Sequence, residues 1–134
     1  MGSVGTSISL VDIKKNLAPG AQIALDKSLY WIDIARKAKT VDEFVKNVPS
    51  SFGMNVDGEF DRVYEELQNG YVYSGERRFN PKPLVDIRLF TKRDAMGLVK
   101  AGIADLNSEY KNNTVLIKIK DKYLKYKSEY EWGV

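Results

Sequence analysis

Apolar residues recur at helical spacing through the first half of the chain. The run "AQIALDKSLYWIDIARKAK" at residues 21–39 is rich in helix formers, and its apolar positions cover a wide face. These positions form a stripe through Ile23, Lys27, Tyr30 and Ile34, beside Leu25, Leu29 and Ile32. The pattern predicts a long helix that the rest of the fold largely covers.

Shorter helices are predicted on both sides of this run. Before it, "SLVDIKKNL" at residues 9–17 favours a short helix, which Pro19 and Gly20 end. After it, Thr40 and Glu43 match a capping box, and Pro49 requires the helix that they open to end before it. The N-terminal part of the chain is therefore expected to be helical.

A further helix is predicted in "GEFDRVYEELQNG" at residues 58–70. Asp57 is its expected N-cap, and Asn69 and Gly70 are its expected stop. Apolar residues with the spacing i, i+3, i+4 and i+7 are Phe60, Val63, Tyr64 and Leu67. This spacing places them on one face of the helix.

The pattern becomes strand-like after Gly70. The stretch "GYVYSGERRF" at 70–79 has the β-branched and aromatic composition of strands, with a turn or bulge at Ser74 and Gly75. The stretch "LVDIRLF" at 84–90 alternates apolar and charged residues, which also predicts a strand.

A long helix is predicted between these strands and the C-terminal segment. Thr91 and Asp94 match the start of a helix over "KRDAMGLVKAGIADLNSEYKN" at 92–112. Its apolar stripe would be Ala95, Val99, Gly102, Leu106 and Tyr110. Gly97 and Gly102 each cost about 1 kcal/mol of helix propensity relative to alanine, so we expect them to permit close approach of another element or of a partner.

The C-terminal stretch "TVLIKIKDKYLKYKSEYEW" at 114–132 alternates apolar and charged residues. A turn at Asp121 and Lys122 would place Ile119 opposite Leu124, which predicts a β-hairpin. The charged face of that hairpin would carry Lys118, Lys120, Lys125 and Lys127. A helix is the alternative, because Leu116, Ile119, Tyr123, Tyr126 and Tyr130 also fit a helical stripe.

These elements predict an α+β fold in one domain spanning residues 1–134, with residues 1–7 as a candidate N-terminal arm. N-terminal helices come first, followed by a mostly antiparallel sheet with one long packed helix and a C-terminal β-hairpin. The 134 residues suffice for a core without metals or disulfides. No run is long and apolar enough to predict a membrane span, so no membrane partner is expected.

Composition removes several kinds of chemistry. The chain has no cysteine and no histidine, which excludes thiolate nucleophiles, disulfides and the side chain best suited to proton transfer at neutral pH. The acidic stretch "NVDGEFD" places Gly58 too early for a helix-loop-helix calcium site. We therefore expect no catalytic residue, no metal site, no cofactor and no enzymatic activity.

Two sets of residues are candidates for binding. Lys118, Lys120, Lys125 and Lys127 could contact phosphates as a nucleic-acid-binding face, or they could be only the solvated side of a strand pair. A net charge of +3 predicts at most weak, non-specific contact with nucleic acid. The second set consists of apolar and arginine residues in turn-rich stretches and predicts a protein interface. It comprises Phe52, Met54, Arg77, Arg78 and Phe79.

Two stretches carry a resemblance to a known family. "LAPGAQIALDKSLYWIDIARKA" at 17–38 and "RRFNPKPLVDIRLF" at 77–90 are similar to segments of small neck or tail-completion proteins of tailed bacteriophages, which join the head to the tail. The resemblance implies a non-enzymatic structural protein of the virion, assembled in the host cytoplasm, that forms a homo-oligomeric ring with neighbouring virion proteins. A small nucleic-acid-binding accessory protein is the alternative function.

Overall fold

A computed structural model of the chain describes residues 9–47, 58, 60–74, 90–110 and 114–128. The helices are α1 (Leu10–Lys14), α2 (Pro19–Lys37), α3 (Val41–Asn47), α4 (Asp61–Gln68) and α5 (Lys92–Lys100). The strands are β1 (Tyr71–Tyr73), β2 (Ala104–Tyr110) and β3 (Thr114–Ile119). Helices combined with one antiparallel sheet confirm the predicted α+β class.

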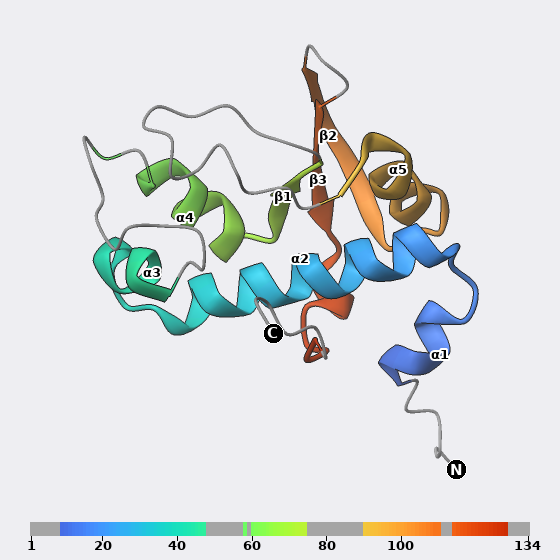
Figure 1. The fold of residues 1–134 in the computed structure, drawn as a ribbon, viewed down its shortest axis with the longest axis horizontal. Helices are drawn as coiled ribbons and strands as arrows, with labels where there is room; N and C mark the ends of the chain where they lie inside the picture. The colour runs from blue at the N-terminus through green and yellow to red at the C-terminus, as the bar shows by residue number, and fades with distance from the viewer. Residues whose placement is uncertain (1–8, 48–57, 59, 75–89, 111–113, 129–134) are drawn as a thin grey trace.

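Helix α2 is the element on which the other helices are assembled. It begins at Pro19, whose fixed φ and missing N–H suit the first position of a helix. Its first half lies beside α5 and its second half beside α4, as Figure 1 shows. Its buried residues are Ala21, Ala24, Leu25, Ser28, Leu29, Trp31, Ile32 and Ala35. The predicted stripe was therefore partly wrong, because Ile23 is 52% exposed and small residues form much of the covered face.

The sheet has the strand order β1-β3-β2, so β3 is its central strand. Both pairings are antiparallel, with Ile117 opposite Val72 of β1 on one side and Leu106 of β2 on the other. Val115, Ile117 and Ile119 alternate with Thr114, Leu116 and Lys118, and the first three are fully buried. One face of β3 therefore forms part of the hydrophobic core, together with residues of α2 and α5.

The predicted helix over 92–112 was right at its start and wrong at its end. The Thr91 hydroxyl accepts a hydrogen bond from the backbone N–H of Asp94, as the cap pattern predicts. The helix stops at Lys100, because Gly102 adopts a left-handed φ of 77°. The N–H groups of Gly102 and Ile103 then donate to the carbonyls of Val99 and Leu98, which is the Schellman arrangement. Residues 104–110 continue as strand β2 instead.

The predicted hairpin with a turn at Asp121 and Lys122 was also wrong. Residues 114–119 do form a strand, but Ile119 lies opposite Ala104 of β2 rather than opposite Leu124. Asp121–Tyr123 forms a 3-10 turn, closed by N–H bonds from Tyr123 to Lys120 and from Leu124 to Asp121. Residues 121–128 therefore form neither the second strand of the predicted hairpin nor the alternative helix. Strand β2, which precedes β3 in the sequence, pairs with β3 instead.

The start of α4 differs from the prediction, whereas its end agrees. The helix begins at Asp61 with Phe60 in the N-cap position, so Asp57 is not its N-cap. Gly70 follows its last residues with a φ of 85°, as expected of a stop. The predicted strand at 84–89 and the predicted arm at 1–7 lie outside the described residues; Phe90 is described, buried and not in a strand.

Gly97 has the role that the sequence predicts, namely close approach between elements. A Cβ at this position would lie 3.1 Å from the Cβ of Ala21 on α2. The contact is made within the monomer, between the first turns of α2 and the middle of α5. Gly102, by contrast, is required for its left-handed φ of 77°, because a Cβ built there would meet no other element of the described fold within 4 Å.

Candidate functional site

The predicted interface set lies outside the described residues. Phe52 and Met54 belong to the range 48–57, and Arg77, Arg78 and Phe79 belong to the range 75–89. Their assignment to a protein interface stays a prediction.

The four predicted nucleic-acid lysines do not share one strand face. Lys118 lies in β3, and Lys120 follows it directly, whereas Lys125 and Lys127 are exposed residues beyond the 3-10 turn. The Lys118 ammonium lies 3.0 Å from Asp121 Oδ1, and that of Lys120 lies 3.9 Å from Asp105 Oδ1. Because acids neutralise two of the four charges locally, the geometry does not give a uniformly basic strand surface.

A cluster of tyrosines and charged groups joins α4 to the sheet. The Tyr73 hydroxyl of β1 donates to Glu66 Oε2 of α4 at 2.9 Å, and Arg62 Nε lies 3.5 Å from the same oxygen. The Tyr73 ring is 5.8 Å from the ring of Tyr110, which reaches across from β2. Tyr73 and then Glu66 raise the pKa of the Arg62 guanidinium, since negative charge nearby favours the cation.

This cluster has the character of a structural contact between a helix and a sheet. Its carboxylate is engaged by both a phenol and a guanidinium, and Tyr73 is only 8% exposed. Tyr110 is its exposed member, at 44%. The cluster holds α4 against β1 and leaves one aromatic ring of edge strand β2 accessible.

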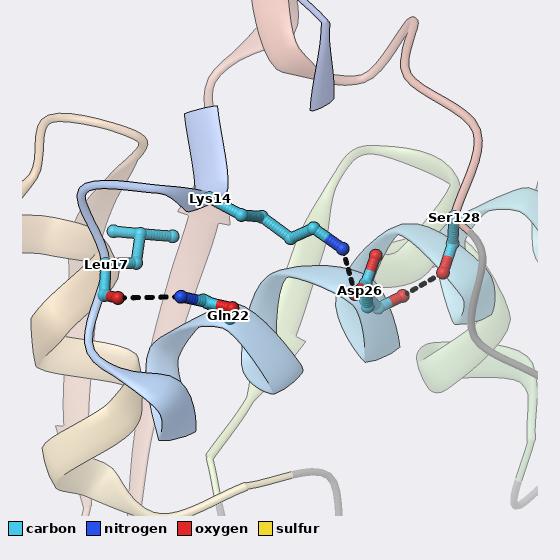
Figure 2. A network of polar contacts seen from close by, with 5 residues as sticks. All are labelled: Lys14, Leu17, Gln22, Asp26 and Ser128. Atoms are coloured by element: carbon cyan, nitrogen blue, oxygen red, sulfur yellow. Dashed lines mark hydrogen bonds and ion pairs between the residues drawn. The ribbon is translucent and has the colours of Figure 1, made fainter. Parts of the chain in front are cut away.

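A second polar cluster lies on α2 and is drawn in Figure 2. Lys14 Nζ of α1 lies 2.7 Å from Asp26 Oδ2, with both side chains 16% exposed. The Ser128 hydroxyl, from the other end of the described chain, donates to the main-chain oxygen of Asp26 at 2.6 Å. Gln22 Nε2 donates to the Leu17 carbonyl at 2.9 Å, which closes the link between the two helices. We call Lys14, Asp26 and Ser128 the Asp26 cluster.

Sequence reasoning missed both clusters. Glu66 and Tyr73 are 7 residues apart, and Ser128 is 102 residues from Asp26, so no local spacing rule connects them. The one available signal for the second cluster was Asp26 itself, an acid between Leu25 and Lys27 on a helix that the sequence predicts to be largely covered. A charge in such a place needs an opposite charge nearby, but the sequence does not say which lysine supplies it.

Metal and membrane features are absent within the described residues. No group of three or more His, Cys, Asp or Glu among them could hold a metal ion. In those same ranges, no helix has both the length and the apolar character required to cross a membrane.

Comparisons with known proteins give no match: neither a family model, nor a curated protein, nor a solved structure is similar to the chain. The likeness to phage neck proteins therefore rests on the two quoted stretches alone. Of these, residues 17–38 contain α2, and residues 77–89 lie outside the described ranges.

Proposed function

We propose that the protein is a non-enzymatic structural component of a tailed-bacteriophage virion, of the head-to-tail joining or tail-completion kind. It acts by binding further copies of itself and neighbouring virion proteins in a ring. The proposal combines the resemblance of residues 17–38 and 77–90 with the surface of strand β2.

The observation that carries the proposal is the exposed edge of the sheet. Among the described residues, strand β2 pairs with β3 alone, and the register of that pairing shifts between Leu106 and Ser108. Leu106 and Tyr110 on this strand are 40% and 44% exposed. An edge strand with exposed apolar side chains suits a protein contact, because a partner can cover the side chains and use the free backbone groups.

The polar contacts support a structural role over a catalytic one. In the described ranges, Glu66 is engaged by Tyr73 and Arg62, and Asp26 is engaged by Lys14. Each of these contacts joins two elements of the fold. They do not bring a nucleophile and a base to one exposed place, which is the arrangement that acid–base or covalent catalysis needs.

The test is a mass measurement of the full chain in solution, combined with a thermal unfolding curve. We expect oligomers that are lost in Leu106→Ser/Tyr110→Ser, while the chain stays folded at the assay temperature and its melting temperature falls only through the loss of the ring contact between Tyr73 and Tyr110. Val11→Ser is the matched control, since Val11 is 53% exposed but lies on α1. A chain that is monomeric at every concentration, alone and with candidate neighbours, contradicts the proposal.

A companion variant addresses the predicted interface outside the described ranges. Phe52→Ser/Phe79→Ser should leave the folded state intact and prevent assembly if these residues contact partners. If the isolated protein unfolds instead, the two residues belong to the core, and the interface assignment is wrong.

Adding DNA to the same mass measurement tests the alternative function. We expect weak binding, because Lys118 and Lys120 each face an acid and few counterions would be released. Tight binding that falls steeply with salt, and that disappears when Lys118, Lys120, Lys125 and Lys127 are neutralised together, would favour the nucleic-acid-binding alternative.

A further inference from the structure

The Asp26 carboxylate is largely buried, and Lys14 balances its charge. Its side chain is 16% exposed, and Oδ2 accepts a hydrogen bond from Lys14 at 2.7 Å. The other oxygen, Oδ1, is buried and has no hydrogen-bond partner among the described residues. Lys14 belongs to α1, a helix of 5 residues that is joined to α2 by a short connection.

The same residue of α2 also holds the last described segment. The Ser128 hydroxyl donates to the main-chain oxygen of Asp26 at 2.6 Å. Tyr123, Leu124 and Tyr126, which precede Ser128, pack against the core while remaining partly exposed. Figure 2 shows Lys14 and Ser128 reaching Asp26 from two different parts of the chain.

We propose that Asp26 couples α1 to the segment 121–128, so that the two leave the surface of α2 together. The coupling follows from the cost of a buried charge without a partner. If Lys14 leaves, the carboxylate stays in a place with little access to water. The hydrogen bond from Ser128 to the main-chain oxygen of Asp26 keeps residues 121–128 beside the same residue of α2, so water gains access to the carboxylate when that segment moves away.

The coupling acts in the reverse direction as well. When Ser128 and its neighbours leave, water surrounds Asp26, and the attraction between its carboxylate and Lys14 weakens because the dielectric constant rises. Loss of the attraction favours release of α1. Reciprocity of this kind is required of any thermodynamic coupling between two sites.

Release would uncover apolar surface that the closed state hides. Leu10 and Leu17, at either end of the α1 region, are 9% and 8% exposed in the closed state. The Asp26 cluster thus controls the release of α1 and of residues 121–128 together. This coupling is a property of the chain itself and does not depend on the proposed virion role.

Amide hydrogen exchange of the full chain tests the coupling directly. The reporters in α1 are the N–H groups of Ile13, Lys15 and Leu17, which bond to backbone carbonyls. The reporters in the last segment are the N–H groups of Tyr123, Leu124 and Tyr126, which do the same. Lys14→Met removes the charge and keeps a stem of similar length.

We expect Lys14→Met to accelerate exchange about tenfold or more in both reporter sets, because opening of either segment relieves the stranded charge. Lys15→Met is the control, since the Lys15 side chain is 69% exposed and its ion pair, with Asp12 at 3.3 Å, stays within the α1 region. It should change neither set. Ser128→Ala should accelerate exchange at the α1 reporters, although Ser128 does not belong to α1.

A rescue variant separates coupling from general loss of stability. Lys14→Met/Asp26→Leu removes the stranded charge, so protection at Tyr123, Leu124 and Tyr126 should return. Acceleration of the α1 reporters alone in Lys14→Met would overturn the proposal. So would an equal acceleration at every amide of the molecule, or a double variant that exchanges as fast as the single one.

Discussion

Replacement of Ile117 tests the central position of β3. Ile117 is fully buried, and strand residues Val72 and Leu106 lie opposite it on its two sides. Ile117→Ala removes buried apolar atoms and leaves a cavity in a place where both neighbouring strands limit collapse. Isoleucine-to-alanine changes in cores cost about 2–5 kcal/mol, and the fixed neighbours place this one at about 3–4 kcal/mol.

Lys118→Ala is the matched control at the next residue. Lys118 points to the other face of β3, its side chain is 31% exposed, and its partner Asp121 is 87% exposed. An ion pair of this kind contributes about 0–1 kcal/mol, so the control should stay close to the parent protein. Ile117→Lys goes further than Ile117→Ala, because it buries a charge, and we expect it to unfold the protein.

Urea unfolding followed by circular dichroism measures the difference. With a slope of about 1.5 kcal/mol per molar urea, a loss of about 3 kcal/mol lowers the midpoint by about 2 M. A change of this size is a large part of the total stability of a small domain, about 5–15 kcal/mol. If Ile117→Ala and Lys118→Ala shift the midpoint equally, the two residues do not face opposite sides of a sheet, and the position given to β3 is wrong.

Three further changes have distinct physical causes. Gly102→Ala should cost about 1–2 kcal/mol in the same urea assay through its left-handed φ of 77° alone, and unchanged stability would contradict the Schellman ending of α5. Gly97→Ala should also destabilise the protein, despite the gain of about 1 kcal/mol in helix propensity, because its Cβ would lie 3.1 Å from that of Ala21. A rise in the urea midpoint would show that α2 and α5 can move apart without loss of stability. Hydrogen bonds from the Ser9 side chain and backbone lower the pKa of Asp12 below 3.8. The contribution of the Asp12 carboxylate to folding stability is therefore present above pH 3.8 and is lost as the pH falls through the lowered pKa. Ser9→Ala should bring the pKa of Asp12 back toward 3.8 in an NMR titration, and an unchanged value would contradict the capping box.

Features determined by a few neighbouring residues were predictable from the sequence. The cap at Thr91 and Asp94, the stop at Gly70 and the single long helix around Leu25 are local, and the structure has them. Each depends on bonds within about one helical turn, where side-chain type decides the outcome. The α+β class follows from the sequence for the same reason, because it needs only the type and order of the elements.

Strand β2 was misassigned because two opposing signals were present. Leu106 and Tyr110 continue the helical spacing of Ala95 and Val99, which favours a longer helix. Gly102 two residues after Lys100 is the opposite signal, a helix C-terminus followed by a new element. The left-handed conformation of Gly102 ends α5, and the residues after it form strand β2. Leu106 and Tyr110 are 40% and 44% exposed, so burial does not account for their apolar character.

Contacts between distant residues could not be predicted from spacing. The Asp26 cluster unites residues from α1, α2 and the segment after β3, and the Tyr73 contact unites β1 with α4. Opposite charges are common along this chain, so many pairings of a lysine with Asp26 are compatible with the sequence. Only the three-dimensional fold brings Lys14 to Asp26, and only the fold brings Ser128 to the same residue.

The C-terminal alternation shows how an error in structure changes an argument about function. Val115, Ile117 and Ile119 are fully buried on the core face of β3, and Leu116 on its other face is buried as well. Leu124 and Tyr126, however, reach the core from the region of a 3-10 turn. Alternation that continues through such a turn does not establish one common face. The lysines between these apolar residues therefore do not add to one basic surface, and two of them face Asp105 and Asp121. A nucleic-acid contact at Lys118 and Lys120 would compete with those acids, whereas a protein contact at β2 needs only that its exposed side chains be covered.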